Sequence, residues 1–135
     1  MKRRYAPSPT LMLHVAVVVL GAALTMGFTT KVQLAPAPTA TASHDIQLQT
    51  AAAFRMGVGP VHVLPAGSRW RAAGLLAQGT VYRPLNHVLL VEGRPVDEAW
   101  PVVDGGRLQG FFLPSETRFA PLRRTVPLPL GDSRA

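Results

Sequence analysis

The chain has 135 residues, a formal net charge of +7 and no cysteine. Once a basic start, an apolar run and a linker are set aside, about 90 residues are left, which suffices for one small domain but not for two. The lack of cysteine excludes disulfides, a cysteine-rich zinc site and a thiol nucleophile.

The positive charge is concentrated at the start of the chain. Four of the 14 lysines and arginines lie at or before Lys31, so ten arginines face seven acidic residues in the rest of the chain. No arginine run exceeds two residues, and the aromatic residues do not interleave with basic ones as a nucleic-acid platform requires. We therefore expect no nucleic-acid partner.

Residues 11–28 form an apolar run without a charge, and Lys2, Arg3 and Arg4 precede it. As a helix this run covers about 27 Å, close to the ~30 Å hydrocarbon core of a bilayer. The cationic flank places residues 1–10 in the cytoplasm by the positive-inside rule. The sequence thus predicts a single-pass anchor with an extracytoplasmic domain. The arginine-rich, lysine-poor and cysteine-free composition indicates a bacterial inner membrane and a periplasmic domain.

Cleavage of this helix is the alternative. Signal peptides usually have an apolar core of about 7–15 residues followed closely by a small-x-small site. Here the run is longer, Pro38 directly follows the site at 35–37, and the site at 40–42 is remote. We favour an uncleaved anchor over a secreted soluble protein beginning near Ser43.

Within the predicted spacer at 29–43, residues 32–43 alternate proline with alanine and threonine and have no apolar face. They predict an extended, partly polyproline spacer on the order of 35 Å long, which holds the domain away from the lipid surface. The domain itself is predicted at 44–130, followed by a flexible tail at 131–135. At its start, residues 45–56 place Ile46, Ala53 and Phe54 on one helical face, which predicts a short helix; the alternation of Ile46 and Leu48 keeps a first strand open.

From Gly57 onward, glycine and proline recur every few residues between short segments rich in valine, leucine and aromatic residues, a pattern typical of a mainly β domain. We predict turns at 93–95 and 104–106 that join a meander over 87–114. The predicted strands lie at 58–64, 79–85, 87–92, 96–103 and 107–113, with a last extended piece at 125–130.

Three features describe how these strands pack. The apolar run at 88–91 suits a central strand, whereas Pro101 cannot donate to a ladder and predicts an edge or a bulge. In the strand at 107–113, simple alternation places Leu108, Gly110 and Phe112 on one face and Phe111 and Leu113 on the other. Since both faces are apolar, we expect barrel closure or contact with a partner.

A Trp100-Pro101-Val102-Val103 strand, a glycine turn, Gly110-Phe111-Phe112-Leu113-Pro114 and a polar turn at 115–117 follow one another. Over residues 79–121 this order resembles the second half of bacterial Src-homology-type (SH3-like) small β-barrels. Ala99 stands where that family usually has glycine, and Phe111-Phe112 replaces its Trp-Val pair. The resemblance implies a barrel of five or six strands that binds cell-wall peptide or another protein.

Residues His87, Glu92, Asp97 and Glu98 are the best set for acid–base chemistry. Asp97 and Glu98 are adjacent on a predicted strand, so their carboxylates leave on opposite faces and cannot form a pair. The sequence has no G-x-S-x-G elbow and no histidine pair at helical metal spacing. We expect no enzyme activity, no cofactor and no metal site.

The candidate partner or ligand surface is Arg69-Trp70-Arg71, with Tyr82 and Trp100 as further aromatic residues. The alternative, which we favour, packs all three aromatic rings into the barrel and leaves both arginines in water. The proline-rich run at 119–130 either straps across its own barrel, the interpretation we prefer, or adds to a partner's sheet edge.

These features together predict a membrane-anchored periplasmic binding or assembly module, an accessory subunit of an envelope complex such as a secretion or conjugation apparatus. Its expected partners are the membrane and another protein. The alternative function is a peptidoglycan-binding barrel tethered to the inner membrane through the same anchor, using Trp70, Tyr82 or Trp100.

Overall fold

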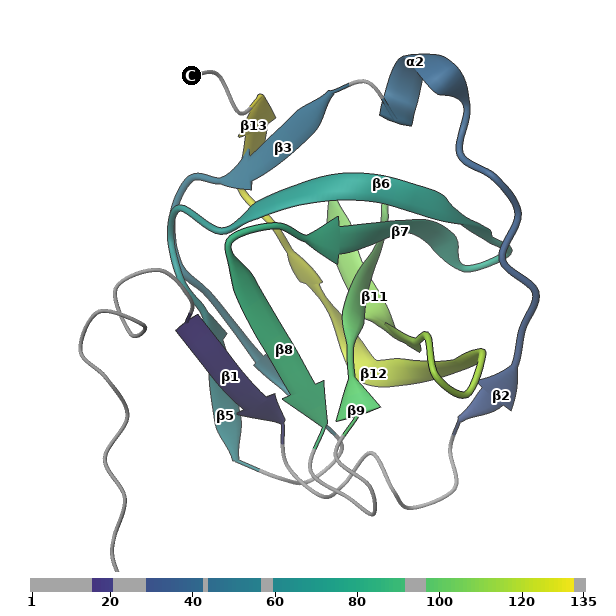
Figure 1. The fold of residues 1–135 in the computed structure, drawn as a ribbon. Helices are drawn as coiled ribbons and strands as arrows, with labels where there is room; N and C mark the ends of the chain where they lie inside the picture. Colours follow the sequence, from purple (N-terminus) through teal and green to yellow (C-terminus); the bar gives the residue numbers. More distant parts are fainter. Residues whose placement is uncertain (1–15, 21–28, 43, 57–59, 92–96, 133–135) are drawn as a thin grey trace, which may run out of the picture.

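A computed structural model of the chain describes residues 16–20, 29–42, 44–56, 60–91 and 97–132. The described fold is mainly β and its largest sheet is antiparallel (Figure 1). In spatial order this sheet contains β13 (Leu130–Asp132), β3 (Asp45–Leu48), β6 (Arg69–Leu76), β7 (Gly79–Pro84), β10 (Trp100–Asp104), β11 (Arg107–Leu113), β12 (Arg118–Pro127) and β2 (Thr30–Lys31).

The large sheet closes on itself through its last segment. Strands β12 and β13 are successive parts of residues 118–132, yet β12 pairs with β11 while β13 pairs with β3 at the other side of the sheet. Figure 1 shows these strands curling around a common interior. The predicted strap at 119–130 is therefore a barrel strand of its own chain, and the described C-terminal residues extend the sheet to Asp132.

Two smaller sheets complete the fold. A hairpin of β4 (Ala52–Arg55) and β5 (Val61–Leu64) packs against β12. The three-stranded sheet has β8 (His87–Val91) at its centre, with β1 (Ala16–Leu20) parallel on one side and β9 (Asp97–Glu98) antiparallel on the other. The chain passes from this sheet into the barrel at Ala99, whose N–H donates to the Leu89 carbonyl at 2.8 Å.

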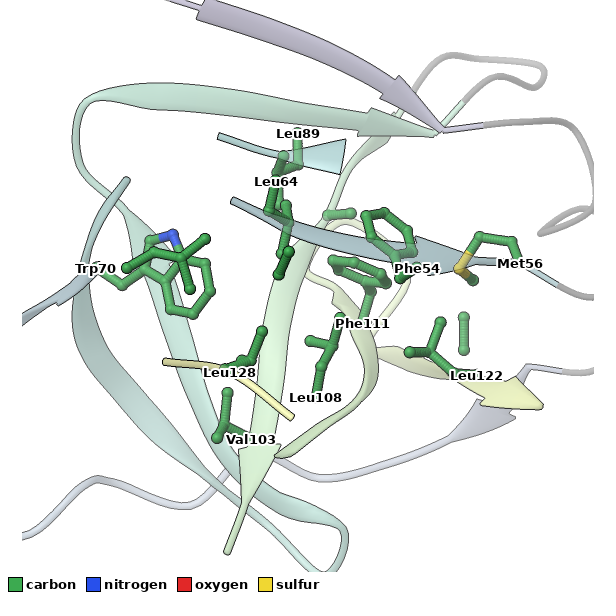
Figure 2. Close-up of a cluster of buried hydrophobic side chains, with 14 of the residues drawn as sticks. Phe54, Met56, Leu64, Trp70, Leu89, Val103, Leu108, Phe111, Leu122 and Leu128 are labelled. Atoms are coloured by element: carbon green, nitrogen blue, oxygen red, sulfur yellow. The ribbon is translucent and has the colours of Figure 1, made fainter. Parts of the chain in front are cut away.

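The main core fills the interior of the barrel and the underside of the hairpin (Figure 2). Trp70, Leu108 and Phe111 have no exposed surface, and Phe54 reaches them from the hairpin. The ring centroids of Phe54 and Phe111 lie 5.3 Å apart. Burial of such large apolar side chains is the dominant favourable term in folding, so the hairpin is an integral part of the core.

A second, smaller core lies on the other side of β7, β10 and β11, where Val81, Val102, Phe112 and Phe119 are buried. Residues of the proline-rich segment cover it: Val32 and Leu34 pack there, and the backbone of Ala35 exchanges hydrogen bonds of 2.7 and 2.9 Å with Leu75. Gly74 permits this approach, because a Cβ at that position would lie 2.6 Å from the Leu34 side chain. Residues 30–35 therefore run along the barrel instead of projecting from it.

The segment at 29–43 also contains a short helix, α2 (Thr39–Ala42), and its β2 part pairs with the start of β12. Of the anchor helix expected at 11–28, the structure describes residues 16–20, which form the strand β1 and not a helical turn. The rest of that run lies outside the described residues. Within the described ranges, no helix has the length and apolar character that crossing a membrane requires.

The helix predicted at 45–56 is wrong. Strands β3 and β4 occupy this segment, because Ala52, Phe54 and Met56 are buried while Ala53 and Arg55 between them are exposed. This period of two matches a strand with one face on the core. Pairing of β3 with β6 and of β4 with β5 satisfies the backbone and overrides the helix preference of the alanines.

Of two predictions for the central strands, one is confirmed and one needs correction. Pro101 is buried in β10 beside a register shift between Val102 and Val103, in line with the predicted edge or bulge, and the pairing of β10 with β7 covers Val102 and Val103 but not Pro101. In β11 the same register shift leaves Gln109 without a partner on β10. The side chains before and after Gln109 therefore do not follow the simple two-residue alternation that the sequence predicted. Leu108 therefore joins Phe111 in the main core and does not share the Phe112 face.

Candidate functional site

An open groove of about 670 Å³ lies between the β4–β5 hairpin and the middle of β12. Its volume falls within the roughly 300–1,000 Å³ typical of ligand sites. Among the residues that the structure describes, the lining combines cationic and apolar side chains without a carboxylate: Ala53, Phe54, Arg55, Val61, Arg123, Arg124 and Val126. The groove is the candidate binding site.

The hairpin supplies one wall of the groove. Its inward face buries Phe54 and Leu64, whereas Val61 and Val63 point outward and are 52% and 51% exposed. Cross-strand pairing places Arg55 opposite Val61 and Ala53 opposite Val63. The outer face of the hairpin is thus an apolar strip with a single guanidinium beside it.

The opposite wall is formed by a bulge in β12. Leu108 of β11 pairs with Val126 and Gly110 pairs with Pro121, so residues 122–125 of β12 lie opposite the single residue Gln109. A regular strand would direct consecutive side chains to opposite faces. Because the strand bulges here, both Arg123 and Arg124 line the groove.

Two contacts hold the bulge in place. At its start, Leu122 is buried in the main core. At its end, Arg107 on the neighbouring strand donates from Nε to the Thr125 hydroxyl at 2.9 Å and from Nη2 to the Thr125 carbonyl at 3.2 Å. The planar guanidinium makes both hydrogen bonds at once, so it fixes the backbone directly after Arg124.

The three groove arginines are exposed and have no ion pair within the described part of the chain. Arg71 differs, since its Nε lies 2.8 Å from Oδ1 of Asp45 and its Nη2 lies 3.1 Å from Oδ2. That hydrogen bond, together with the charge of Arg71, lowers the pKa of Asp45. Positive charge on Arg55, Arg123 and Arg124 is thus free to attract an anion.

The residues named as a candidate partner surface are not together on one face. Trp70 is fully buried and its ring lies 6.2 Å from that of Tyr82, which is half-buried and whose pKa burial raises. Arg69 and Arg71 flank Trp70 but lie on the solvent side of β6, as strand alternation requires. Trp70 therefore cannot serve as a surface platform.

Trp100, the third aromatic residue of the candidate partner surface, is half-buried on the outer side of the barrel. Its ring packs 6.1 Å from Phe112, and its Nε1 donates to Oε2 of Glu98 at 2.9 Å. The indole is thus held in place by the second core and by a neighbouring carboxylate. It lies apart from the groove described above.

The predicted acid–base set is only partly described. His87 is buried, its Nδ1 lies 3.1 Å from Oδ1 of Asn86, and burial lowers its pKa to about 4. Glu92 lies outside the described residues, and so do Lys2, Arg3 and Arg4. In the described ranges, no cluster of three or more histidine, cysteine or acidic residues could hold a metal ion.

Sequence reasoning missed the groove because its walls come from segments about 70 residues apart. The adjacent Arg123 and Arg124 can be read from the sequence, but in a regular strand their side chains would point to opposite faces of the sheet. Only the register between β11 and β12 shows that they face the same groove. The proline residues at 121 and 127, which bracket the irregular stretch, were the available signal.

Comparison of the chain with protein-family models, with curated proteins and with solved structures finds no match. The resemblance to Src-homology-type barrels thus rests on the sequence motifs within residues 79–121 alone. The function has to be inferred from the groove and from the sequence.

Proposed function

We propose that this protein is a binding or assembly module anchored in the bacterial inner membrane, with a periplasmic β domain that engages a protein partner through the groove between β4–β5 and β12. The observation that carries the proposal is the groove itself, where three arginines without ion pairs in the described structure surround an apolar wall. This composition favours recognition of a ligand over chemistry, because arginine does not exchange protons at neutral pH.

The anchor is an expectation from the sequence, and it has a structural consequence. Residues 16–20 lie in the middle of the apolar run and pair with β8 in the described fold. They cannot be helical in a bilayer and pair with β8 at the same time. In the anchored protein we therefore expect β1 to leave β8 and the barrel to begin at β2.

The contacts of residues 30–35 support a position of the barrel near the bilayer. Only Thr29 separates the predicted span from β2, which pairs with Arg118 and Phe119. A chain of two or three residues reaches at most about 10 Å. The domain would thus rest close to the lipid headgroups, and the proline-rich segment would act as part of the barrel rather than as a stalk.

Cysteine labelling in whole cells tests the topology, because the chain has no cysteine of its own. We expect a membrane-impermeant maleimide to label Thr50→Cys, an exposed position between β3 and β4, in cells with a permeable outer membrane. Ala6→Cys should react only after lysis. Labelling of both positions in intact cells, or of neither, would refute the proposed orientation.

The alternative of a peptidoglycan-binding barrel loses one of its three candidate residues, since Trp70 is buried. Sedimentation of the purified protein with sacculi discriminates the two functions. If Trp100→Ala lowers the amount of protein that sediments with sacculi and Arg123→Ala/Arg124→Ala does not, the peptidoglycan alternative is favoured over the groove.

A further inference from the structure

The charge pattern of the groove defines the chemistry of its occupant. Arg55 projects from the hairpin, while Arg123 and Arg124 project from the β12 bulge, so cationic groups stand on both walls. Guanidinium groups bind carboxylates with paired, charge-assisted hydrogen bonds, each stronger than a neutral one. Because the described lining residues include no carboxylate, the groove is complementary to a ligand that carries several negative charges.

The apolar part of the wall restricts the ligand further. Val61 and Val126 lie in the lining, and Val63 continues the apolar strip on the hairpin surface. Each wall of the groove thus combines apolar and cationic side chains, with Arg55 and Val61 on the hairpin and Arg123, Arg124 and Val126 on β12. An extended peptide segment presents acidic and apolar side chains with the same close spacing, whereas a lipid separates its charged headgroup from its acyl chains.

We propose that the groove binds an extended acidic segment of a partner protein, with its carboxylates on Arg55, Arg123 and Arg124 and an intervening apolar side chain against Val61 and Val126. This inference deepens the proposed function and rests on it for the identity of the partner as a protein. The binding itself needs no membrane, so it can be measured separately from the topology.

Arg107 acts as a positioning residue in this proposal. Its two hydrogen bonds to Thr125 hold the end of the bulge from which Arg123 and Arg124 project. Lysine at this position keeps the charge but cannot make the same forked contact. The spacing of the two groove arginines therefore depends on a side chain that is not in the groove lining.

The test is fluorescence anisotropy with the full chain in a non-ionic detergent and a fluorescein-labelled peptide of alternating glutamate and valine. We expect Arg123→Ala/Arg124→Ala to weaken binding by about tenfold or more, as loss of a charge-assisted hydrogen bond does. The matched control, Arg69→Ala/Arg83→Ala, removes the same charge from exposed positions on β6 and β7 and should change affinity less than about twofold.

Charge reversal gives a gain of function that simple unfolding cannot imitate. The Arg123→Glu/Arg124→Glu variant should no longer bind the glutamate–valine probe and should instead bind the corresponding lysine–valine peptide. Arg107→Lys should weaken the affinity of the protein for the glutamate–valine probe severalfold, while Arg69→Lys should leave that affinity unchanged. If Arg107→Lys binds like the parent protein, the positioning role of Arg107 is wrong.

Three results would overturn the proposal. Equal losses in the groove variant and the control variant would show that only net charge matters. If phosphatidylglycerol in the micelles displaces the probe at a lower concentration than the unlabelled peptide does, the groove is a lipid-binding site. No binding of the probe, in a protein whose cysteine labelling confirms the topology, would refute the acidic-segment ligand and leave the anchored module standing.

Discussion

Removal of the Phe54 side chain is the sharpest test of how the hairpin joins the barrel. Phe54 is 3% exposed, and its ring packs 5.3 Å from that of Phe111 and 5.5 Å from that of His62. Truncation of a buried phenylalanine to alanine costs about 3–5 kcal/mol. A domain of this size has a total stability of only about 5–15 kcal/mol. We therefore expect Phe54→Ala to lose a large part of its stability.

The assay is urea unfolding of the full chain in non-ionic detergent, followed by the fluorescence of Trp70 and Trp100. A double-mutant cycle of Phe54→Ala with Phe111→Ala should give a coupling of about 0.5–1.5 kcal/mol for the ring pair. The control is Val63→Ala on the exposed side of the same hairpin, which should cost less than about 0.5 kcal/mol. A cost below about 1 kcal/mol for Phe54→Ala, or additive single effects, would refute the packing.

Two further changes test the barrel. Gly110→Ala should cost about 1–3 kcal/mol in the same assay, because its Cβ would clash with the backbone of Ala120 and Pro121, whereas Gly131→Ala meets only a flexible glutamine side chain and should be tolerated. His87, with its pKa lowered to about 4, stays neutral in the fold while the unfolded chain takes up a proton below pH ~6.5. Stability should therefore fall as the pH drops from about 6.5 to 4, by up to roughly 3 kcal/mol, and His87→Gln should remove this part of the pH dependence; an identical pH profile in the variant would contradict it.

The sequence predicted the hairpin of β10 and β11 well, because local signals dominate there. The turn at 104–106 is confirmed, with Gly105 and Gly106 at φ 58° and 73° joining β10 to β11. The strand predicted at 107–113 has the bounds of β11. Glycine and aspartate fix such a turn through their own backbone preferences, so no distant contact is needed to specify it.

Long-range pairing determined the parts that were missed. Strand β6 was not predicted, although Arg69, Trp70, Arg71 and Ala72 alternate between exposed and buried, because alanine and Gly74 weaken any strand signal. Its stability comes from pairing with β3 and β7. The bulge at 122–125 is likewise a property of two strands in register, and it cannot be seen in either sequence segment alone.

Site-specific photo-crosslinking in cells tests the central claim, that the groove engages a protein partner. A photoreactive residue at Val63, on the exposed rim beside the groove, should give a discrete crosslinked protein, and the adduct should disappear in Arg123→Ala/Arg124→Ala. The same residue at the exposed Ala77, in the turn between β6 and β7, should give none. No adduct from Val63, or the same adduct from both positions, would contradict the account.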